Sequence, residues 1–435
     1  MGEMRILMEH LADPDQAAIE TYEKKGGYQT LKRALAQANP SEITEAVLQS
    51  GLKGRGGAGF LTGKKWEFLP KDPSIPVYLV CNCDESEPGT FKDRLLVEKD
   101  PHQLIEGLIL SAYAIGCRHA FIYCRGEYFK PLNLLRKALI DSKAKGYWGR
   151  SVLGSSYSLE ITLHPGAGAY IAGEETALLE SLEGYRALPR LKPPFPASQG
   201  LYRKPTIINN VETLCNVVHI VKKGAAWYRE IGTENSRGTK IFQVSGQVKR
   251  PGCFEFPFGV RLREVLEAAG WMLPGRQFKA CYPGGSSCSL LHASDLDMTM
   301  DFETLEKRGS ALGTASIIVL DDTADMVKVA HRLMEFYQHE SCGKCTPCRE
   351  GTRWVVQMLA RILEGKGTFE DLPKILQVCR SMAGTSFCPL AVGAAPPVIS
   401  ALEGFKSEFE AYVNRNPRKD QVAEMKVAYP YTPRV

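Results

Sequence analysis

Three cysteines at positions 342, 345 and 348 constrain this chain more than any other feature of its sequence. Their CxxCxxC spacing allows three thiolates to converge on one iron–sulfur cubane, and a fourth ligand must come from elsewhere. Cys388 precedes a proline at the expected start of a helix and is the natural fourth ligand. Cys379 competes with it, but falls in line with apolar residues at helical spacing and is expected to be a core residue. The spacing therefore predicts a [4Fe–4S] cluster on Cys342, Cys345, Cys348 and Cys388.

Two alternatives to a redox cluster stay open at this point. Zinc also binds four cysteines, although its sites more often combine two CxxC pairs than three closely spaced cysteines. A cluster can also be purely structural, in a protein module that binds no ligand elsewhere.

The sequence around these cysteines has a helical pattern. From Ala324 to about Val413, apolar residues recur at helical spacing in four segments, the last of which includes Phe405 and Phe409. The three clustered cysteines fall between the first two segments, and Cys388 opens the last. Four amphipathic helices with short links predict a small bundle.

The remainder of the chain changes character near residue 239. Before it, strand patterns at 77–81 and 120–124 alternate with a helical pattern at 101–115, which predicts an α/β layer with a largely parallel sheet. After it we expect a hairpin, a short helix and a closing strand, at 241–245 with 253–256, 262–269 and 316–320. The sequence thus predicts a multidomain α/β and α+β fold. The expected domains are 1–238, 239–322 and 323–435.

Composition excludes several classes of function. The formal charge of +5 is small for 435 residues, and scattered Lys and Arg residues weaken any nucleic-acid role. The most apolar stretch, 104–117, contains Glu106 and is too short to span a membrane. We expect no direct membrane insertion and no secretion signal. Thirteen cysteines, an odd number in a long chain, indicate thiols in a reducing compartment, and Cys81 and Cys83 are expected to pack on opposite faces of a strand.

Four polar or glycine-rich loops indicate a binding crevice. Residues 54–59 match GxGxxG by letter, but follow a helical pattern where a dinucleotide fingerprint follows a strand. Residues 82–89 place polar side chains directly after a strand, where α/β folds bind ligands. Residues 166–175 and 209–213 are two further loops of this kind. Together they predict a crevice for a ligand with phosphates, a polyol and a ring.

Several longer motifs carry a resemblance to a known family. In chain order they are GRGGAGF at 54–60, CNCDESEPGTFKDR at 81–94, GAGAYIAGEETALLESLEG at 166–184, RLKPPFP at 190–196, KPTIINNVET at 204–213 and ESCGKCTPCREG at 340–351. The chain resembles the NADH-binding flavoprotein subunit of respiratory complex I, which is the F subunit of NADH:quinone oxidoreductase. The resemblance implies a Rossmann-like FMN- and NADH-binding domain, a ubiquitin-like β-grasp domain and a helical bundle holding the cluster.

The resemblance also implies roles for individual residues. FMN would be cradled by Gly54, Arg55, Gly56, Gly57 and Lys65, and its polar atoms bonded by Asn82, Asp84, Glu85, Ser86, Gly173, Glu174, Asn209, Asn210 and Thr213. For NADH, Phe60, Phe68 and Phe195 would stack on adenine, with Lys192 near the nucleotide. Glu87 and Glu175 would hold the ribose and nicotinamide end.

The implied activity is oxidation of NADH by hydride transfer to FMN, followed by single-electron transfer to the cluster. The implied partners are a thioredoxin-like [2Fe–2S] subunit and a larger multi-cluster subunit. The implied location is cytoplasmic and peripheral, on the inner face of a bacterial plasma membrane. The alternative is the diaphorase subunit of an NAD-linked formate dehydrogenase or hydrogenase. Residues Leu61, Cys83, Ala172 and Tyr202 depart from the family pattern.

Overall fold

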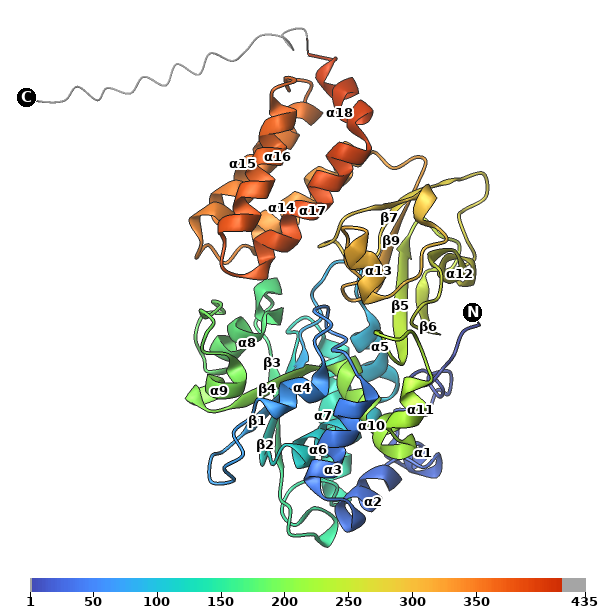
Figure 1. The fold of residues 1–435 in the computed structure, drawn as a ribbon, viewed down its shortest axis with the longest axis vertical. Coiled ribbons are helices and arrows are strands. Elements are labelled where there is room, and N and C mark those ends of the chain that lie inside the picture. Colours follow the sequence, from blue (N-terminus) through green and yellow to red (C-terminus); the bar gives the residue numbers. More distant parts are fainter. Residues whose placement is uncertain (1, 417–435) are drawn as a thin grey trace, which may run out of the picture.

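The computed structural model describes residues 2–416, and its elements form three regions along the longest axis of the molecule (Figure 1). We call them the α/β region (2–238), the β-grasp region (239–322) and the helical bundle (323–416). The predicted mixed α/β fold with a parallel sheet and a helical C-terminal region is confirmed.

The α/β region contains a four-stranded sheet in the order β3–β2–β1–β4, in which every adjacent pair is parallel. Its strands are β1 (Tyr78–Cys83), β2 (His119–Cys124), β3 (Glu160–Pro165) and β4 (Thr206–Asn210). Parallel strands need long crossover connections, and helices fill them here. Sequence pattern identified β1 and β2 but neither β3 nor β4.

Helices cover both faces of this sheet. The larger set comprises α5 (Lys92–Lys99), α6 (Pro101–Ala114), α7 (Phe129–Ala144) and α10 (Val211–Lys223). They share one core with Cys81 and Cys83, so the expectation of opposite faces for these cysteines is wrong: residues two apart on a strand point the same way. Val80 packs on the other face against α8 (Glu175–Leu182).

Shorter helices complete the α/β region. At the N-terminal side they are α1 (Ile19–Lys24), α2 (Gln29–Gln37), α3 (Pro40–Ser50) and α4 (Thr62–Glu67). Later in the chain come α9 (Pro196–Gln199) and α11 (Ala225–Arg229). Helix α3 begins with a capping box on Asn39 and ends at Gly51, whose φ of 70° suits a glycine. The glycine-rich loop between α3 and α4 therefore follows a helix, as the sequence indicated.

The β-grasp region has a five-stranded sheet in the order β6–β5–β9–β7–β8, whose central pair β5 and β9 is parallel. Its strands are β5 (Thr239–Gly246), β6 (Gly252–Pro257), β7 (Phe278–Tyr282), β8 (Leu291–His292) and β9 (Ser316–Asp321). Its helices are α12 (Leu262–Ala268) and α13 (Phe302–Lys307). The expected hairpin, helix and closing strand are present, whereas β7 and β8 had no clear period-2 signal.

The helical bundle contains five helices among the described residues, where the sequence predicted four. They are α14 (Met326–Glu340), α15 (Thr346–Leu363), α16 (Asp371–Thr385), α17 (Pro389–Gly404) and α18 (Lys406–Val413). The last predicted helix breaks at Phe405, which has non-helical angles of φ −128° and ψ 37°. The break turns the chain so that Phe409 and Val413 enter the bundle core.

The domain limits at 238/239 and 322/323 remain a prediction. The positions of the strands support them, because β5 begins at Thr239 and β9 ends at Asp321. The part of the proposed third domain at 417–435 lies outside the described residues. Within residues 2–416, none of the helices is both long enough and apolar enough to cross a membrane.

Candidate functional site

The carboxyl ends of β1 and β4 form the centre of the candidate site. These strands are adjacent, and Asn82 and Asn210 occupy paired positions at their ends. The Asn82 side chain donates to the carbonyl of Gly173 at 2.9 Å and accepts from the backbone N–H of Asp84 at 3.0 Å. Three loops that are far apart in the sequence therefore meet here, at the edge where parallel sheets bind ligands.

The glycine-rich loop at 54–59 joins the same place. The backbone N–H of Arg55 donates to the hydroxyl of Thr213 at 2.8 Å, and a Cβ on Gly56 would lie 3.2 Å from Cβ of Asn210. Gly57 has a φ of 129° and would have nothing within 4 Å of a Cβ. Its backbone can therefore closely approach a ligand phosphate, as an FMN cradle requires.

Asp84 gives a second test of the fit to FMN. Its carboxylate is buried, and atom Oδ2 has no hydrogen-bond partner within the described protein. Burial raises the pKa of Asp84 to about 7, although Ser86 and Arg125 oppose the shift. A buried carboxylate oxygen without a donor is costly, and the hydroxyls of a ribityl chain would supply one. The residues present fit FMN.

Several predicted FMN residues have side chains that are already engaged with protein. The guanidinium of Arg55 is fully buried and points toward the β-grasp region, where it donates to the carbonyls of Arg237 and Thr239. The Glu85 carboxylate accepts from the first N–H groups of α5, and burial raises its pKa to about 7. Asn209 accepts from the indole of Trp66 at 2.9 Å. These side chains hold the loops in place, and since the Arg55 backbone N–H also donates to Thr213, Arg55 serves the crevice by fixing the loop.

A chain of ion pairs links the proposed FMN and nucleotide residues. The ammonium of Lys65 lies 2.9 Å from Glu175, and that of Lys192 lies 3.0 Å from both Glu174 and Glu175. Burial alone would raise the pKa of Glu175, but the two ammonium groups outweigh it and the pKa falls below its ordinary value. Glu175 is therefore held as a carboxylate at the start of α8.

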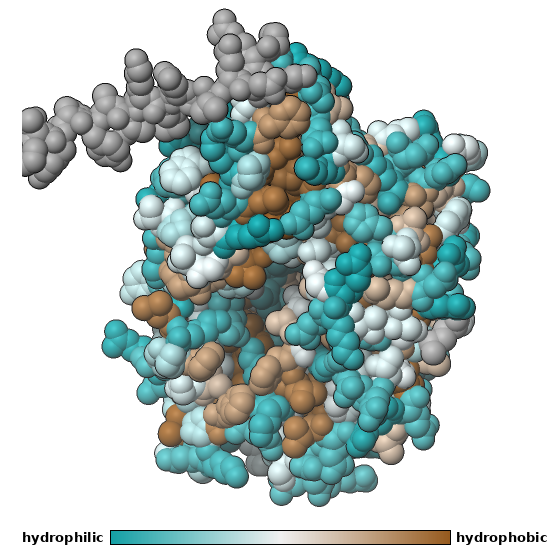
Figure 2. Space-filling model, turned by 45° about the horizontal axis from the view of Figure 1, so that its top comes forward, coloured by the Kyte–Doolittle hydropathy of each residue, from teal (hydrophilic) through white to brown (hydrophobic). Residues whose placement is uncertain are grey.

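Three aromatic rings proposed to stack on adenine are unusually open to solvent. Phe60, Phe68 and Phe195 are 51%, 56% and 58% exposed, and the rings of Phe60 and Phe68 lie 6.2 Å apart between centroids. Hydrophobic surface is visible beside the hollow between the bundle and the rest of the molecule (Figure 2). An exposed pair of neighbouring rings such as Phe60 and Phe68 is typical of a ligand-binding surface.

Glu87 lies where the regions meet. Its carboxylate accepts from the hydroxyl of Tyr170 at 2.7 Å, from Ser286 at 3.1 Å and from the backbone N–H of Ser287 at 2.9 Å. Burial raises the pKa of Glu87 despite these bonds. The carboxylate joins the α/β and β-grasp regions. Its Oε1 accepts two of these bonds and its Oε2 one, so Oε2 retains the capacity to accept from a nucleotide hydroxyl.

The four predicted cluster ligands lie at one end of the bundle, in the segments that precede α15 and α17 and, for Cys348, in the first turn of α15. Cys342 is in the loop between α14 and α15, while Cys345 and Cys388 are the N-cap residues of α15 and α17. Burial is the main cause that raises the pKa of the Cys388 thiol to about 11, and the other three thiols contribute smaller increases. Helix N-termini favour the thiolate form that a cluster requires. Cys379 is fully buried in the bundle core, as expected.

The chemistry of these four thiols suits a cluster. Among residues 2–416, no three His, Cys, Asp or Glu side chains are placed to hold one metal ion. The four thiolates of a cubane each bind a different iron, so they need not approach one another as the ligands of a single ion do. The donor set fits a [4Fe–4S] cluster.

Comparison with known proteins covers the same segments. Residues 47–219 match the model of the Nuo51 FMN-binding domain, 241–290 the SLBB domain, and 328–412 the NADH-ubiquinone oxidoreductase-F iron-sulfur binding region. The second NADH-quinone oxidoreductase F subunit of Rhizobium meliloti is 52% identical over 409 residues, covering 94% of this chain and 97% of that protein. The F subunit of Escherichia coli is 46% identical over 406 residues, covering 93% and 91%. The chain belongs to the family of NADH-quinone oxidoreductase F subunits.

A solved structure gives the same fold within a different assembly. An NAD⁺-reducing [NiFe]-hydrogenase in the H₂-reduced state has a chain that superposes on this family member with a TM-score of 0.83 at 37% identity. The match covers 94% of this chain and 67% of that chain. All four loops of the crevice lie within the FMN-binding match, and all four cysteines lie within the iron–sulfur match.

Sequence reasoning missed a buried group of charges beneath the crevice. Lys92 and Lys240 are fully buried and both contact Glu212, with the Lys92 ammonium 3.1 Å from that carboxylate. Lys92 also donates to Asn210 at 3.1 Å. Nothing in the local sequence separates a buried lysine from an exposed one; only its place within the family motif at 81–94 hinted at a role.

Two departures from the family pattern have structural consequences. Cys83 is buried with its sulfur 3.9 Å from that of Cys124, the paired residue on β2. Tyr202 and Arg203 have φ values of 49° and 60°, in the left-handed region that favours glycine. Neither departure removes a side chain from the crevice.

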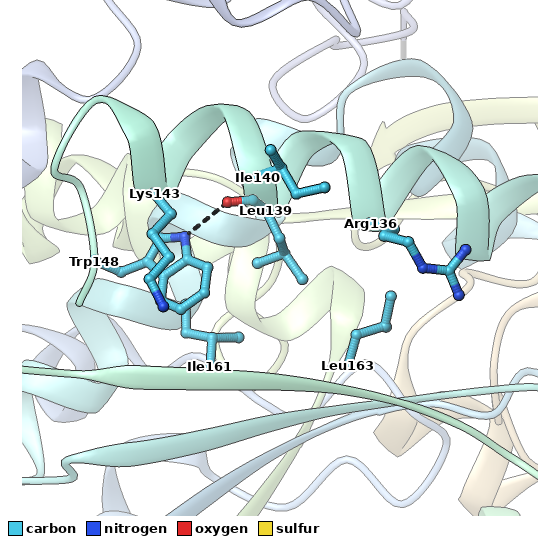
Figure 3. A pocket seen from close by; sticks show the side chains of 7 residues that line it. All are labelled: Arg136, Leu139, Ile140, Lys143, Trp148, Ile161 and Leu163. Atoms are coloured by element: carbon cyan, nitrogen blue, oxygen red, sulfur yellow. Dashed lines mark hydrogen bonds between the residues drawn. The ribbon is translucent and has the colours of Figure 1, made fainter.

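A separate hollow of about 230 Å³ lies between α7 and the edge strand β3 (Figure 3). Leu139, Ile140, Ile161 and Leu163 line it, and the indole of Trp148 donates to the carbonyl of Leu139 at 3.1 Å. It shares no lining residue with the crevice, so the family's functional site is not found there.

Proposed function

We propose that this chain binds FMN and NADH in the crevice at the ends of β1 and β4 and holds its cluster on Cys342, Cys345, Cys348 and Cys388. The chain is an NADH dehydrogenase subunit with FMN and a [4Fe–4S] cluster as cofactors, the electron-input module of NADH:quinone oxidoreductase. The observation that carries the site assignment is the meeting of four separate loops around Asn82 and Asn210.

The proposed FMN residues divide by how they act. Gly56 and Gly57 bring backbone close to the phosphate, since Gly57 has open space beyond it. Gly54 and Arg55 fix the shape of the loop, because their backbone N–H groups donate to Phe60 and Thr213. Lys65 adds positive charge, and Asp84 offers its unpartnered oxygen to a ribityl hydroxyl. The remaining polar residues orient these groups or bond the flavin: Asn82, Glu85, Ser86, Gly173, Glu174, Asn209, Asn210 and Thr213.

The proposed NADH residues divide between the adenine end and the nicotinamide end of the nucleotide. Phe60, Phe68 and Phe195 present exposed ring faces to adenine, and Lys192 neutralises the nucleotide phosphates. Glu175 and Glu87 bond the ribose and nicotinamide end, with Glu175 kept anionic by Lys65 and Lys192. When bound, FMN would supply the chemistry that takes up a hydride, and a cluster would supply single-electron transfer. The protein itself positions the nucleotide; no side chain need act as an acid or base.

The partner proposal follows from the relatives, which are subunits of larger complexes by name. We expect a thioredoxin-like [2Fe–2S] subunit and a multi-cluster subunit to receive the electrons. The complex would place this chain on the cytoplasmic side of a bacterial plasma membrane. The hydrogenase likeness supports a second candidate, a diaphorase subunit of an NAD-linked hydrogenase or formate dehydrogenase. Identification of the chains that co-purify distinguishes the two.

Asp84→Asn tests the crevice assignment. The amide of the variant accepts a hydrogen bond from a ribityl hydroxyl less strongly than the Asp84 carboxylate does. We therefore expect FMN to bind at least tenfold more weakly, while the cluster content stays unchanged. The measurement is FMN fluorescence quenching by the flavin-depleted complex, beside iron content. Asp15→Asn, an exposed substitution of the same kind, is the control. Equal FMN affinity in Asp84→Asn and wild type would contradict the assignment.

A further inference from the structure

The loop that carries Cys342 and Cys345 is tied to the segment that carries the proposed nucleotide residues. The ammonium of Lys344 donates to the carbonyl of Pro189 at 2.7 Å. The guanidinium of Arg186 donates in the opposite direction, to the carbonyl of Cys342 at 3.2 Å. Two hydrogen bonds therefore join the cysteine loop to residues 186–189, although the two segments are more than 150 residues apart in the chain.

Lys344 also reaches the second cysteine loop. Its ammonium lies 4.8 Å from the ring centroid of Phe387, which directly precedes Cys388. This distance is within the range of a cation–π contact. The ammonium of Lys344 thus contacts the residue before Cys388, while the backbone of Lys344 lies between Cys342 and Cys345 in the chain.

The nucleotide segment is in turn braced against α8. Arg190 pairs with Glu180 and Glu183 at 2.5 and 2.9 Å, and its backbone N–H donates to Thr176 at 2.8 Å. Lys192 pairs with Glu174 and Glu175 at the start of the same helix. A nucleotide that displaces Lys192 from these carboxylates would therefore move the segment that contains Pro189. The carbonyl of Pro189 accepts the hydrogen bond from Lys344.

We propose that Lys344 is a positioning residue that couples occupation of the nucleotide site to the reduction potential of the cluster. The inference rests on the proposed function of the crevice and of the four cysteines. Reduction adds one electron to the cluster and makes it more negative, so a nearby ammonium stabilises the reduced form and raises the potential. The hydrogen bond to Pro189 sets where that ammonium stands, and nucleotide binding changes it.

The test is a redox titration of the cluster in the purified complex, with and without saturating NAD⁺. Electron paramagnetic resonance measures the reduced fraction of the cluster at each potential. Lys344→Met keeps all but the last atom of the side chain's length and removes its charge. We expect the ratio of reduced to oxidised cluster at a fixed potential to fall about tenfold, which is 59 mV for a one-electron couple. Lys344→Arg restores the charge and the donor, and should return the potential toward wild type.

The measurements with NAD⁺ test the coupling between nucleotide binding and the potential of the cluster. In wild type, saturating NAD⁺ should shift the potential of the cluster, and the shift should be lost in Lys344→Met and reduced in Arg186→Met. Lys374→Met on α16 is the matched control, because it removes an exposed lysine about 16 Å along the helix from the end near Cys388. A potential in Lys344→Met equal to that in wild type, or an undiminished NAD⁺ shift, would overturn the proposal.

Failure of this inference is distinguishable from failure of the proposed function. Wild-type complex that contains flavin and iron and reduces ferricyanide with NADH, but whose cluster potential is independent of Lys344, keeps the function and loses only the coupling. Complex without flavin or without a cluster signal would remove the function on which the inference rests.

Discussion

The ammonium of Lys92 lies 3.1 Å from the side-chain oxygen of Asn210, while the nitrogen of the same amide donates to Asp93 at 2.6 Å. The two neighbouring residues thus hold the amide by both of its ends and determine which way it faces. Since Asn210 also caps α10 at the edge of the crevice, this contact joins a buried ion cluster to the proposed FMN site.

Lys92→Met should therefore lower both stability and FMN content. Lys92 is fully buried between Asp93 and Glu212, and removing it leaves two buried carboxylates with less compensation. Breaking a buried pair in this way costs about 3 kcal/mol or more of unfolding free energy. Urea unfolding and flavin absorbance measure the two effects. Lys137→Met removes an exposed partner of Asp141 and should cost less than about 1 kcal/mol; an equal loss in both variants would contradict the reasoning.

Asp100 should make stability depend on pH. Burial raises its pKa to about 7 in the folded protein, opposed by hydrogen bonds from Gln103 and Gln16, against an ordinary value near 4. The folded state therefore binds this proton more tightly than the unfolded state does. The resulting stability is present below about pH 4 and is lost as the pH rises to 7.

Asp100→Asn lacks this dependence. Its unfolding free energy relative to wild type should rise between pH 4 and 7 by up to about 4 kcal/mol and stay constant above pH 7. Urea unfolding at several pH values measures the difference. Curves for wild type and Asp100→Asn that run parallel would show that burial does not shift this carboxyl.

Phe68→Ala should weaken NADH binding without releasing FMN. The ring is 56% exposed, so its removal leaves no cavity in the core. Loss of one stacking partner is worth about 1.4 kcal/mol, so KM for NADH should rise about tenfold. Phe129→Ala removes a ring that is 75% exposed on α7 and should leave KM unchanged. Steady-state kinetics with ferricyanide as acceptor, beside flavin content, decides the matter.

Cys388→Ala and Cys379→Ala should differ in iron content. Cys388 begins α17 beside the cysteine loop, so its loss should remove the cluster signal or reduce it severalfold. Cys379 lies within the bundle core and is fully buried, so Cys379→Ala should keep the cluster and lose only about 1 kcal/mol of stability. Iron analysis and electron paramagnetic resonance compare the variants. A retained cluster in Cys388→Ala would exclude it as the fourth ligand.

Sequence reasoning reached different depths in different parts of the molecule. Periodicity located β1, β2, α6 and the first three bundle helices, because these elements bury a continuous apolar face. It did not locate β3, because the residues of that strand are mostly partly buried or exposed and show no clear alternation. It also predicted one continuous last bundle helix where the structure has a break at Phe405. The β-grasp region packs closely beside this break, where a Cβ on Gly404 would lie 2.6 Å from the ring of His292.

The family motifs by themselves determined the cofactors, the activity and the residues that belong to each loop, because ligand chemistry requires particular residue types at particular spacings. The tertiary structure decided what each side chain of those loops faces. Arg55 is turned toward the β-grasp region, Lys92 orients Asn210 from below, and Lys344 joins the cysteine loop to Pro189. Such contacts join residues distant in the chain, and burial and direction are properties of the packed molecule rather than of any local segment.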